Sequence, residues 1–119
     1  MPISLDYQGA QMQTKYYVFL HVPGPNWLAG KPVTEQPLAG HFQYMSRLES
    51  EGKLVLGGGF LDGSGAMGVL TANSQSEADQ IVANDPAVKE QIVKATVHPW
   101  YVTVVGRIEI SDDSVTEQH

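Results

Sequence analysis

The chain has 119 residues, 42% of them hydrophobic and 17% charged, which is the composition of one globular domain. It has no cysteine, and this excludes disulfide frameworks, thiolate zinc sites, iron–sulfur clusters and cysteine nucleophiles. Thirteen acidic residues against seven scattered basic ones give a net charge of −6, so nucleic-acid binding is not expected. Because no apolar run approaches ~20 residues and the N-terminus resembles no signal peptide, we expect a cytoplasmic protein with no membrane partner.

Residues 1–14 are polar and Gln-rich, and we interpret them as an N-terminal tail. A β-rich apolar run predicts a buried strand over 15–22, which Pro23 ends. A loop rich in Pro and Gly follows over 23–33. Trp27 in its middle is typical both of a lid or pocket wall and of a plug over the core.

A helix is predicted next, with Thr34 as its cap, Pro37 in its first turn and an end near Glu51. Its apolar residues recur at spacings of four, three and three, which predicts one buried stripe made of Leu38, Phe42, Met45 and Leu48. Gly52 directly follows and is typical of a helix end.

Two strands, 54–61 and 66–71, are joined by a four-residue turn and are predicted to form a hairpin. Ser74 and Glu77 then fit a capping box, in which each side chain accepts a hydrogen bond from the other's backbone. The helix that follows is expected to end near Asn84 and to bury three residues, namely Ala78, Ile81 and Val82.

Asp85 and Pro86 are typical of the cap and first residue of a second, short helix, expected to reach about Lys94. A long β-rich segment over 95–110 predicts the last strand, bent at Pro99 and Gly106. We therefore expect the domain to span 15–110 and the acidic residues 111–119 to form a C-terminal tail.

The order strand–helix–strand–strand–helix–strand predicts an α+β, ferredoxin-like βαββαβ fold with an antiparallel sheet. Its helices cover only one face of the sheet. Because the other face carries apolar side chains, we expect it to be buried by self-association, as a homodimer or higher homo-oligomer.

Four histidines are present, and none has a histidine or carboxylate partner at a spacing typical of metal ligands, so no metal site is expected. His41 lies within the apolar stripe of the first helix. It is therefore either a histidine at the edge of the core, bonded to a backbone carbonyl, or a general acid/base, since an unperturbed imidazole titrates near ~6.5. His21 is expected to be structural.

Asp85 also has two interpretations. It is either only the cap of the short helix, or the partner of His41 that selects one imidazole tautomer. The two helices of such a fold lie side by side, which permits the pairing without showing it.

Three further motifs give weaker hypotheses. The run Gly57–Gly59 is not a phosphate loop, because no Lys and Ser/Thr follow it and it leads into a strand. Met1 and Pro2 could expose a prolyl amine like that of tautomerases, but a dozen polar residues separate them from the first strand. The segment from His98 to Tyr101 is expected to pack the core or a dimer interface.

The chain from about Lys15 to Val104 resembles the YciI-like (YCII-related) family. The residues that carry this resemblance are the stretch from His41 to Leu54, Gly57-Gly58-Gly59-Phe60, Ser74 with Glu77 and Ala78, Asn84-Asp85-Pro86, and Pro99-Trp100. The residues after Pro86, the third glycine, the loop over 24–33 and the C-terminal extension depart from the family's pattern, which leaves the substrate open.

The resemblance implies a ferredoxin-like fold that dimerises sheet to sheet as an α+β barrel. It also implies an active site made of a histidine on the first helix and the aspartate of an Asp-Pro motif, which match His41 and Asp85. A family member is a dehydrochlorinase that acts on a chlorinated hydroxyhydroquinone. By analogy, His41 would be the base and Asp85 would orient it, with neither a metal nor an organic cofactor.

Three functional hypotheses follow. The first is a lyase or isomerase, free of cofactor, that uses His41 and Asp85 for proton transfer on a small aromatic molecule. The second is a non-enzymatic dimer that binds a small ligand or a protein partner, with Asp85 acting only as a cap. The third is oxygenation of an electron-rich ring without a cofactor.

Overall fold

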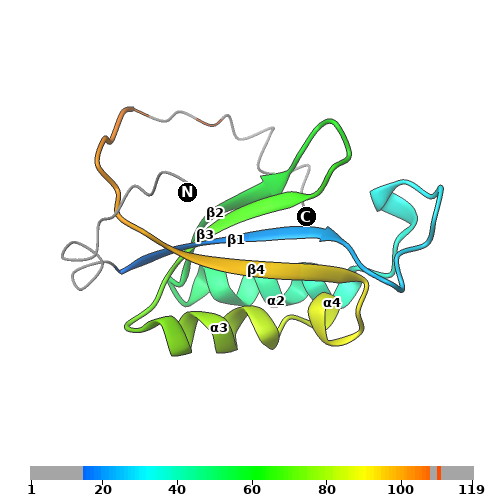
Figure 1. Ribbon diagram of the computed structural model, residues 1–119, viewed down its shortest axis with the longest axis horizontal. Helices are drawn as coiled ribbons and strands as arrows, with labels where there is room; N and C mark the ends of the chain where they lie inside the picture. The colour runs from blue at the N-terminus through cyan, green and yellow to red at the C-terminus, as the bar shows by residue number, and fades with distance from the viewer. Residues whose placement is uncertain (1–14, 108–109, 111–119) are drawn as a thin grey trace, which may run out of the picture.

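The computed structural model describes residues 15–107 and 110 of the chain. It contains a four-stranded antiparallel sheet in the order β2-β3-β1-β4, with helices on one face (Figure 1). The elements, in chain order, are β1 (Tyr16–Pro23), the 3-10 turn η1 (Val33–Glu35), α2 (Ala39–Ser50), β2 (Leu54–Gly59), β3 (Ala66–Thr71), α3 (Gln75–Ala83), α4 (Pro86–Lys89) and β4 (Val93–Trp100). This order confirms the predicted α+β, ferredoxin-like fold.

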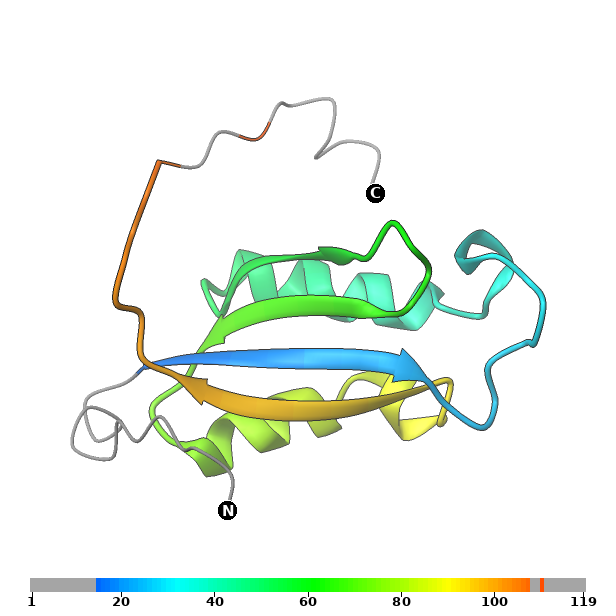
Figure 2. The same cartoon turned by 45° about the horizontal axis from the view of Figure 1, so that its top comes forward.

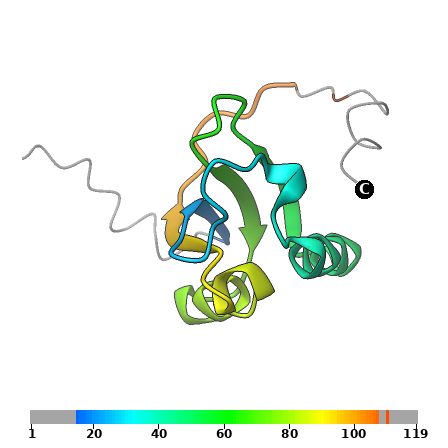
Figure 3. The same cartoon turned by 90° about the vertical axis from the view of Figure 1, so that its right-hand side faces the viewer.

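The two central strands, β1 and β3, carry the side chains that pack under the helices. Tyr17 and Phe19 alternate with exposed or half-buried residues along β1, as expected for a strand with one face against the core. Figure 2 shows the four strands crossing above the helices, and Figure 3 shows α2 beside α3 and α4 beneath the sheet.

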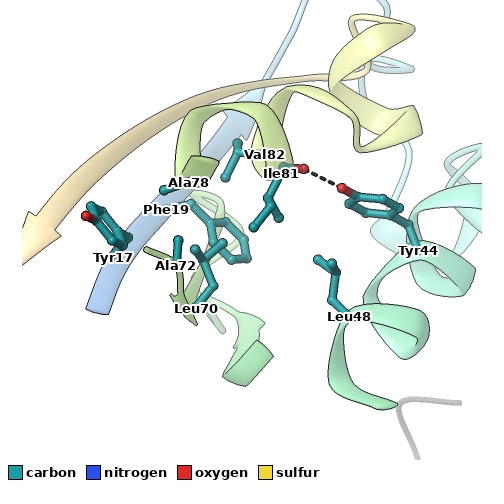
Figure 4. Close-up of a cluster of buried hydrophobic side chains, with 9 residues drawn as sticks. All are labelled: Tyr17, Phe19, Tyr44, Leu48, Leu70, Ala72, Ala78, Ile81 and Val82. Carbon is teal, nitrogen blue, oxygen red and sulfur yellow. Dashed lines mark hydrogen bonds between the residues drawn. The ribbon is translucent and has the colours of Figure 1, made fainter. Parts of the chain in front are cut away.

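The main core lies between these strands and the helices α2 and α3 (Figure 4). Its buried residues are Tyr17, Phe19, Tyr44, Leu48, Leu70, Ala72, Ala78, Ile81 and Val82. The Tyr44 hydroxyl donates a 2.6 Å hydrogen bond to the carbonyl of Ile81, so the two long helices are also joined by a polar contact. The predicted buried residues of α3 are confirmed.

The end of the molecule near α4 has a second, smaller core. It consists of Leu38, Ala87, Ile92 and Val93, with Trp27 and Val88 packed against it. The loop that carries Trp27 is fixed by the buried amide of Gln36, which bonds to the backbone of Leu28 and Lys31. Trp27 therefore covers a core, as one of the two interpretations of this loop predicted.

The predicted start of the first helix was wrong. The helix begins at Ala39, with Leu38 as its N-cap, whereas Thr34 lies in the 3-10 turn. Gln36 between them has an extended backbone, because a residue that precedes proline clashes in the α conformation. The predicted stripe was also wrong in one member: Phe42 is 48% exposed, and Tyr44 takes its place in the core.

The predicted bounds of α4 and of the last strand need correction as well. The helix ends at Lys89, because Gln91 adopts a left-handed backbone with φ of 59°. The strand starts at Val93 opposite Pro23 and ends at Trp100 opposite Tyr16, where β1 itself begins. The last strand, predicted to reach residue 110, therefore ends at Trp100.

The Ser74 cap of α3 is present, since its side chain accepts a hydrogen bond from the backbone of Glu77. The carboxylate of Glu77, which the capping box assigned to the Ser74 backbone, instead accepts a bond from the Asn73 amide. Among the described residues, no helix has the length and apolar composition of a membrane span.

No helix covers the second face of the sheet in the described part of the chain (Figure 1), and this face carries apolar side chains that are open to solvent. Five of them are 39% to 48% exposed, namely Tyr16, Val22, Leu56, Met67 and Trp100. The uncovered face predicted from the sequence is therefore present, and its burial in a homodimer remains a prediction.

Candidate active site

Three titratable side chains from three separate elements meet at the end of the sheet next to α4. His21 is near the end of β1, His41 is in the first turn of α2, and Asp85 is the N-cap of α4. Their donor atoms all lie within 4.8 Å of one another. Residues separated by 20 and 44 positions in the sequence thus form one cluster.

Asp85 is the centre of this cluster and is only 1% exposed. Its Oδ1 accepts a 2.9 Å hydrogen bond from the backbone N–H of Ala87, which is the cap of α4. Its Oδ2 lies 2.7 Å from Nδ1 of His41. Asp85 is therefore both the cap of α4 and a hydrogen-bond partner of His41, because each oxygen serves a different partner.

The approach of α2 to α4 explains why this pair can form. Gly40, directly before His41, faces Pro86, directly after Asp85, and a Cβ on Gly40 would lie 3.2 Å from the proline ring. That distance is tighter than an ordinary van der Waals contact. A residue without a side chain thus lets the two helix ends come close enough for His41 to reach Asp85.

His41 keeps contact with solvent while its partner does not. Its side chain is 15% exposed, and its ring meets the exposed Phe42 ring edge-on at 5.2 Å between centroids. A carboxylate beside Nδ1 favours the tautomer with hydrogen on that atom, which leaves the lone pair on Nε2. Such a nitrogen can accept a proton from a bound molecule.

His21 is the member of the cluster whose place sequence analysis missed. It is 4% exposed, and its ring lies between those of Phe19 and His41, at centroid distances of 5.1 and 5.6 Å. Burial lowers the pKa of His21; the Asp85 carboxylate opposes this shift, and His41 adds to it. The sequence held a signal for its burial, because His21 is two residues after Phe19 and four after Tyr17 and therefore shares the strand face that packs under the helices.

The remaining candidates from the sequence lie away from the cluster. His98 is exposed on the opposite face of the sheet, where its Nε2 lies 3.0 Å from Oγ1 of Thr96. The glycines of β2 have ordinary contacts or open space around them, and a register shift interrupts the strand between Leu54 and Leu56. Met1, Pro2 and His119 lie outside the described residues.

The space around the cluster is closed on its inner side. The gap beside Asp85, between His21 and the apolar core, is too small for a water molecule. A wider hollow of about 340 Å³ lies at the other end of the sheet, lined by residues that include Lys15, Glu51 and Glu77. Within the described part of the chain, His41 is the most exposed member of the cluster, so its side chain offers the route for a molecule from solvent.

The known proteins that are similar to this chain include one from a sequence comparison and one from a structural comparison. An uncharacterized protein of Bacillus subtilis (strain 168), YjpA, is 33% identical over 66 residues, which cover 56% of this chain and 78% of YjpA. The structure of 5-chloro-2-hydroxyhydroquinone dehydrochlorinase (TftG) from Burkholderia phenoliruptrix AC1100, in complex with 2,5-dihydroxybenzoquinone, superposes with a TM-score of 0.57 at 24% identity. That match covers 71% of this chain and 92% of TftG.

The likeness to TftG supports the fold, since the sequence identity is low. A family model describes the sequence itself and matches from residue 15 to residue 101, from one residue before β1 to one residue after β4. This span includes His21, His41 and Asp85. The chain belongs to the family of YCII-related domains.

Proposed function

We propose that the protein is a lyase or isomerase, free of cofactor, in which His41 and Asp85 transfer a proton on a small aromatic molecule. The observation that supports this most directly is the 2.7 Å contact between His41 Nδ1 and a carboxylate that is 1% exposed. A buried carboxylate held by one partner on each oxygen is a fixed charge. It can orient the imidazole and stabilise the imidazolium that forms when Nε2 accepts a proton.

The substrate class comes from the structural likeness. The neighbour TftG is a dehydrochlorinase, and its structure holds a dihydroxybenzoquinone. On a chlorinated hydroxyhydroquinone, Nε2 of His41 would take the proton of one ring hydroxyl and return it to the carbon that bears chlorine. The C–Cl bond then breaks, chloride leaves with the bonding electrons, and a second hydroxyl releases its proton to solvent. The ring leaves as a hydroxybenzoquinone, with net loss of HCl.

The experiment is a chloride-release assay with 5-chloro-2-hydroxyhydroquinone, together with deuterium exchange into ring carbons of dechlorinated hydroxyhydroquinones. The variants are His41→Ala and Asp85→Asn, with His98→Gln as the matched control, because His98 is exposed on the other face of the sheet. We expect both activities in the wild type and the control, and a loss of about 10³-fold or more in the two dyad variants.

Unchanged turnover in His41→Ala would refute the proposal. Oxygen uptake in place of chloride release or exchange would support the oxygenation hypothesis. The rival hypothesis is a non-enzymatic, dimeric protein that binds a small ligand or a partner, and the closed gap beside Asp85 favours it. Tight binding of the aromatic compounds without exchange or elimination would support that rival.

A further inference from the structure

Within residues 15–107 and 110, the buried Nε2 atom of His21 has no hydrogen-bond partner, and it has no role in the dyad. Leaving such a nitrogen unpaired lowers the stability of the folded chain. An aliphatic side chain would pack beside Phe19 and Leu70, which line the same small gap, without that cost. A histidine at this position is therefore explained best by something that its nitrogen can bind.

His21 belongs to a group of three side chains whose types are common metal ligands. Two imidazoles and one carboxylate lie within 4.8 Å of one another, and this set of donors suits divalent transition-metal ions. The carboxylate is already fixed by the backbone N–H of Ala87 at 2.9 Å. Carboxylates that ligate metals are commonly held by such outer hydrogen bonds.

We propose that His21, His41 and Asp85 bind a divalent transition-metal ion, with Zn²⁺ as the probe. Zinc lies about 2.0–2.2 Å from nitrogen and oxygen ligands, which places the donors of a tetrahedral site about 3.3 Å apart. Nδ1 of His41 and Oδ2 of Asp85 are 2.7 Å apart, and they would separate slightly as the ion displaces the proton that they share. The ring of His21 would move toward the ion.

The bound ion would prevent the proton transfer proposed above. A neutral imidazole has one nitrogen lone pair, so an ion on Nδ1 of His41 leaves hydrogen on Nε2. The ion is then an inhibitor and not a cofactor. The binding itself does not rest on the proposed function, because it is measured without any substrate.

The test is a titration of the full chain, first freed of metal with a chelator, with ZnCl₂ at neutral pH. Calorimetry gives the stoichiometry and affinity, and ¹⁵N NMR of the histidine rings identifies the ligands. The variant His21→Leu removes one donor, and Phe19→Leu is its matched control, because it changes the neighbouring ring without removing a donor.

We expect one ion per chain, altered ring signals of His21 and His41, and unaltered signals of His98. Affinity should fall at least about tenfold in His21→Leu and not in the control. The proposal is overturned if no binding is detected up to about 1 mM Zn²⁺, or if His21→Leu binds as tightly as the wild type. If His21→Leu does not fold, the wild-type spectra decide, and an unmoved Nε2 signal of His21 refutes the site.

Discussion

Asp85 holds two partners at once, and two substitutions separate their effects. In Asp85→Asn, the amide oxygen can still accept the 2.9 Å bond from Ala87, because Asn caps helices about as well as Asp. The amide nitrogen then faces Nδ1 of His41 and donates a hydrogen bond to it. In the wild type, the carboxylate at this place accepts the hydrogen bond from Nδ1. The proton of the imidazole therefore moves to Nε2. In Asp85→Ala both partners are lost.

The two variants should differ most in stability. Loss of the cap together with a buried, unpaired N–H at Ala87 costs about 2–3 kcal/mol in Asp85→Ala, whereas Asp85→Asn costs less than about 1 kcal/mol. At roughly 4 °C per kcal/mol, the difference is measurable as separate melting temperatures. Urea denaturation gives the same comparison as free energies of unfolding.

The tautomer should change in the variant that keeps the fold. Ring ¹⁵N spectra of His41 distinguish hydrogen on Nδ1 from hydrogen on Nε2, and we expect the first in the wild type and the second in Asp85→Asn. Turnover should fall by about 10³-fold or more, since Nε2 can no longer accept a proton. An unchanged tautomer in Asp85→Asn, or equal melting temperatures of the two variants, would refute the reasoning about this residue.

Three other outcomes follow from single contacts. Burial lowers the pKa of His21, so the unfolded chain binds more protons than the folded chain as the pH falls below about 6.5. The free energy of unfolding should therefore decrease as the pH falls through this range. Urea denaturation at several pH values should show that this free energy depends less on pH in His21→Leu. Gly65→Ala should destabilise the protein by more than about 1 kcal/mol, since φ is +156° and a Cβ would collide with the carbonyl oxygen of His21. Gly63→Ala is the control: its φ is +77° but the space around it is open, so it should destabilise the protein less in the same denaturation assay. Tyr44→Phe should lower the free energy of unfolding by about 1–2 kcal/mol, because the carbonyl of Ile81 loses its buried donor, and an unchanged melting temperature would contradict this.

The sequence predicts most of the fold because its signals are local. The β-rich apolar run that forms β1, the Ser74 cap and the Asp85-Pro86 helix start each depend on a few neighbouring residues, and the structure confirms all of them. The errors arise where a single backbone conformation overrides the pattern. The proline after Gln36 delays α2, and the left-handed Gln91 shortens α4.

In the site, too, local signals in the sequence point to single residues, whereas their contact depends on the folded chain. His41 stood out because an imidazole within an apolar stripe is unusual, and Asp85 because it precedes a proline at a helix start. Their 2.7 Å contact is decided by tertiary structure, since it depends on how closely α2 packs against α4 at Gly40 and Pro86.

His21 marks what sequence spacing cannot show. A search for metal ligands at short spacings finds none, because the three donors come from a strand and two helices that are far apart in the chain. By itself, the sequence predicted the order of elements and the uncovered sheet face, and it singled out His41 and Asp85 without showing that they meet. The packing of β1, α2 and α4 at one end of the sheet decided that the imidazole of His21 lies beside His41 and Asp85. Burial and distance arise from the folded chain and not from the order of its residues.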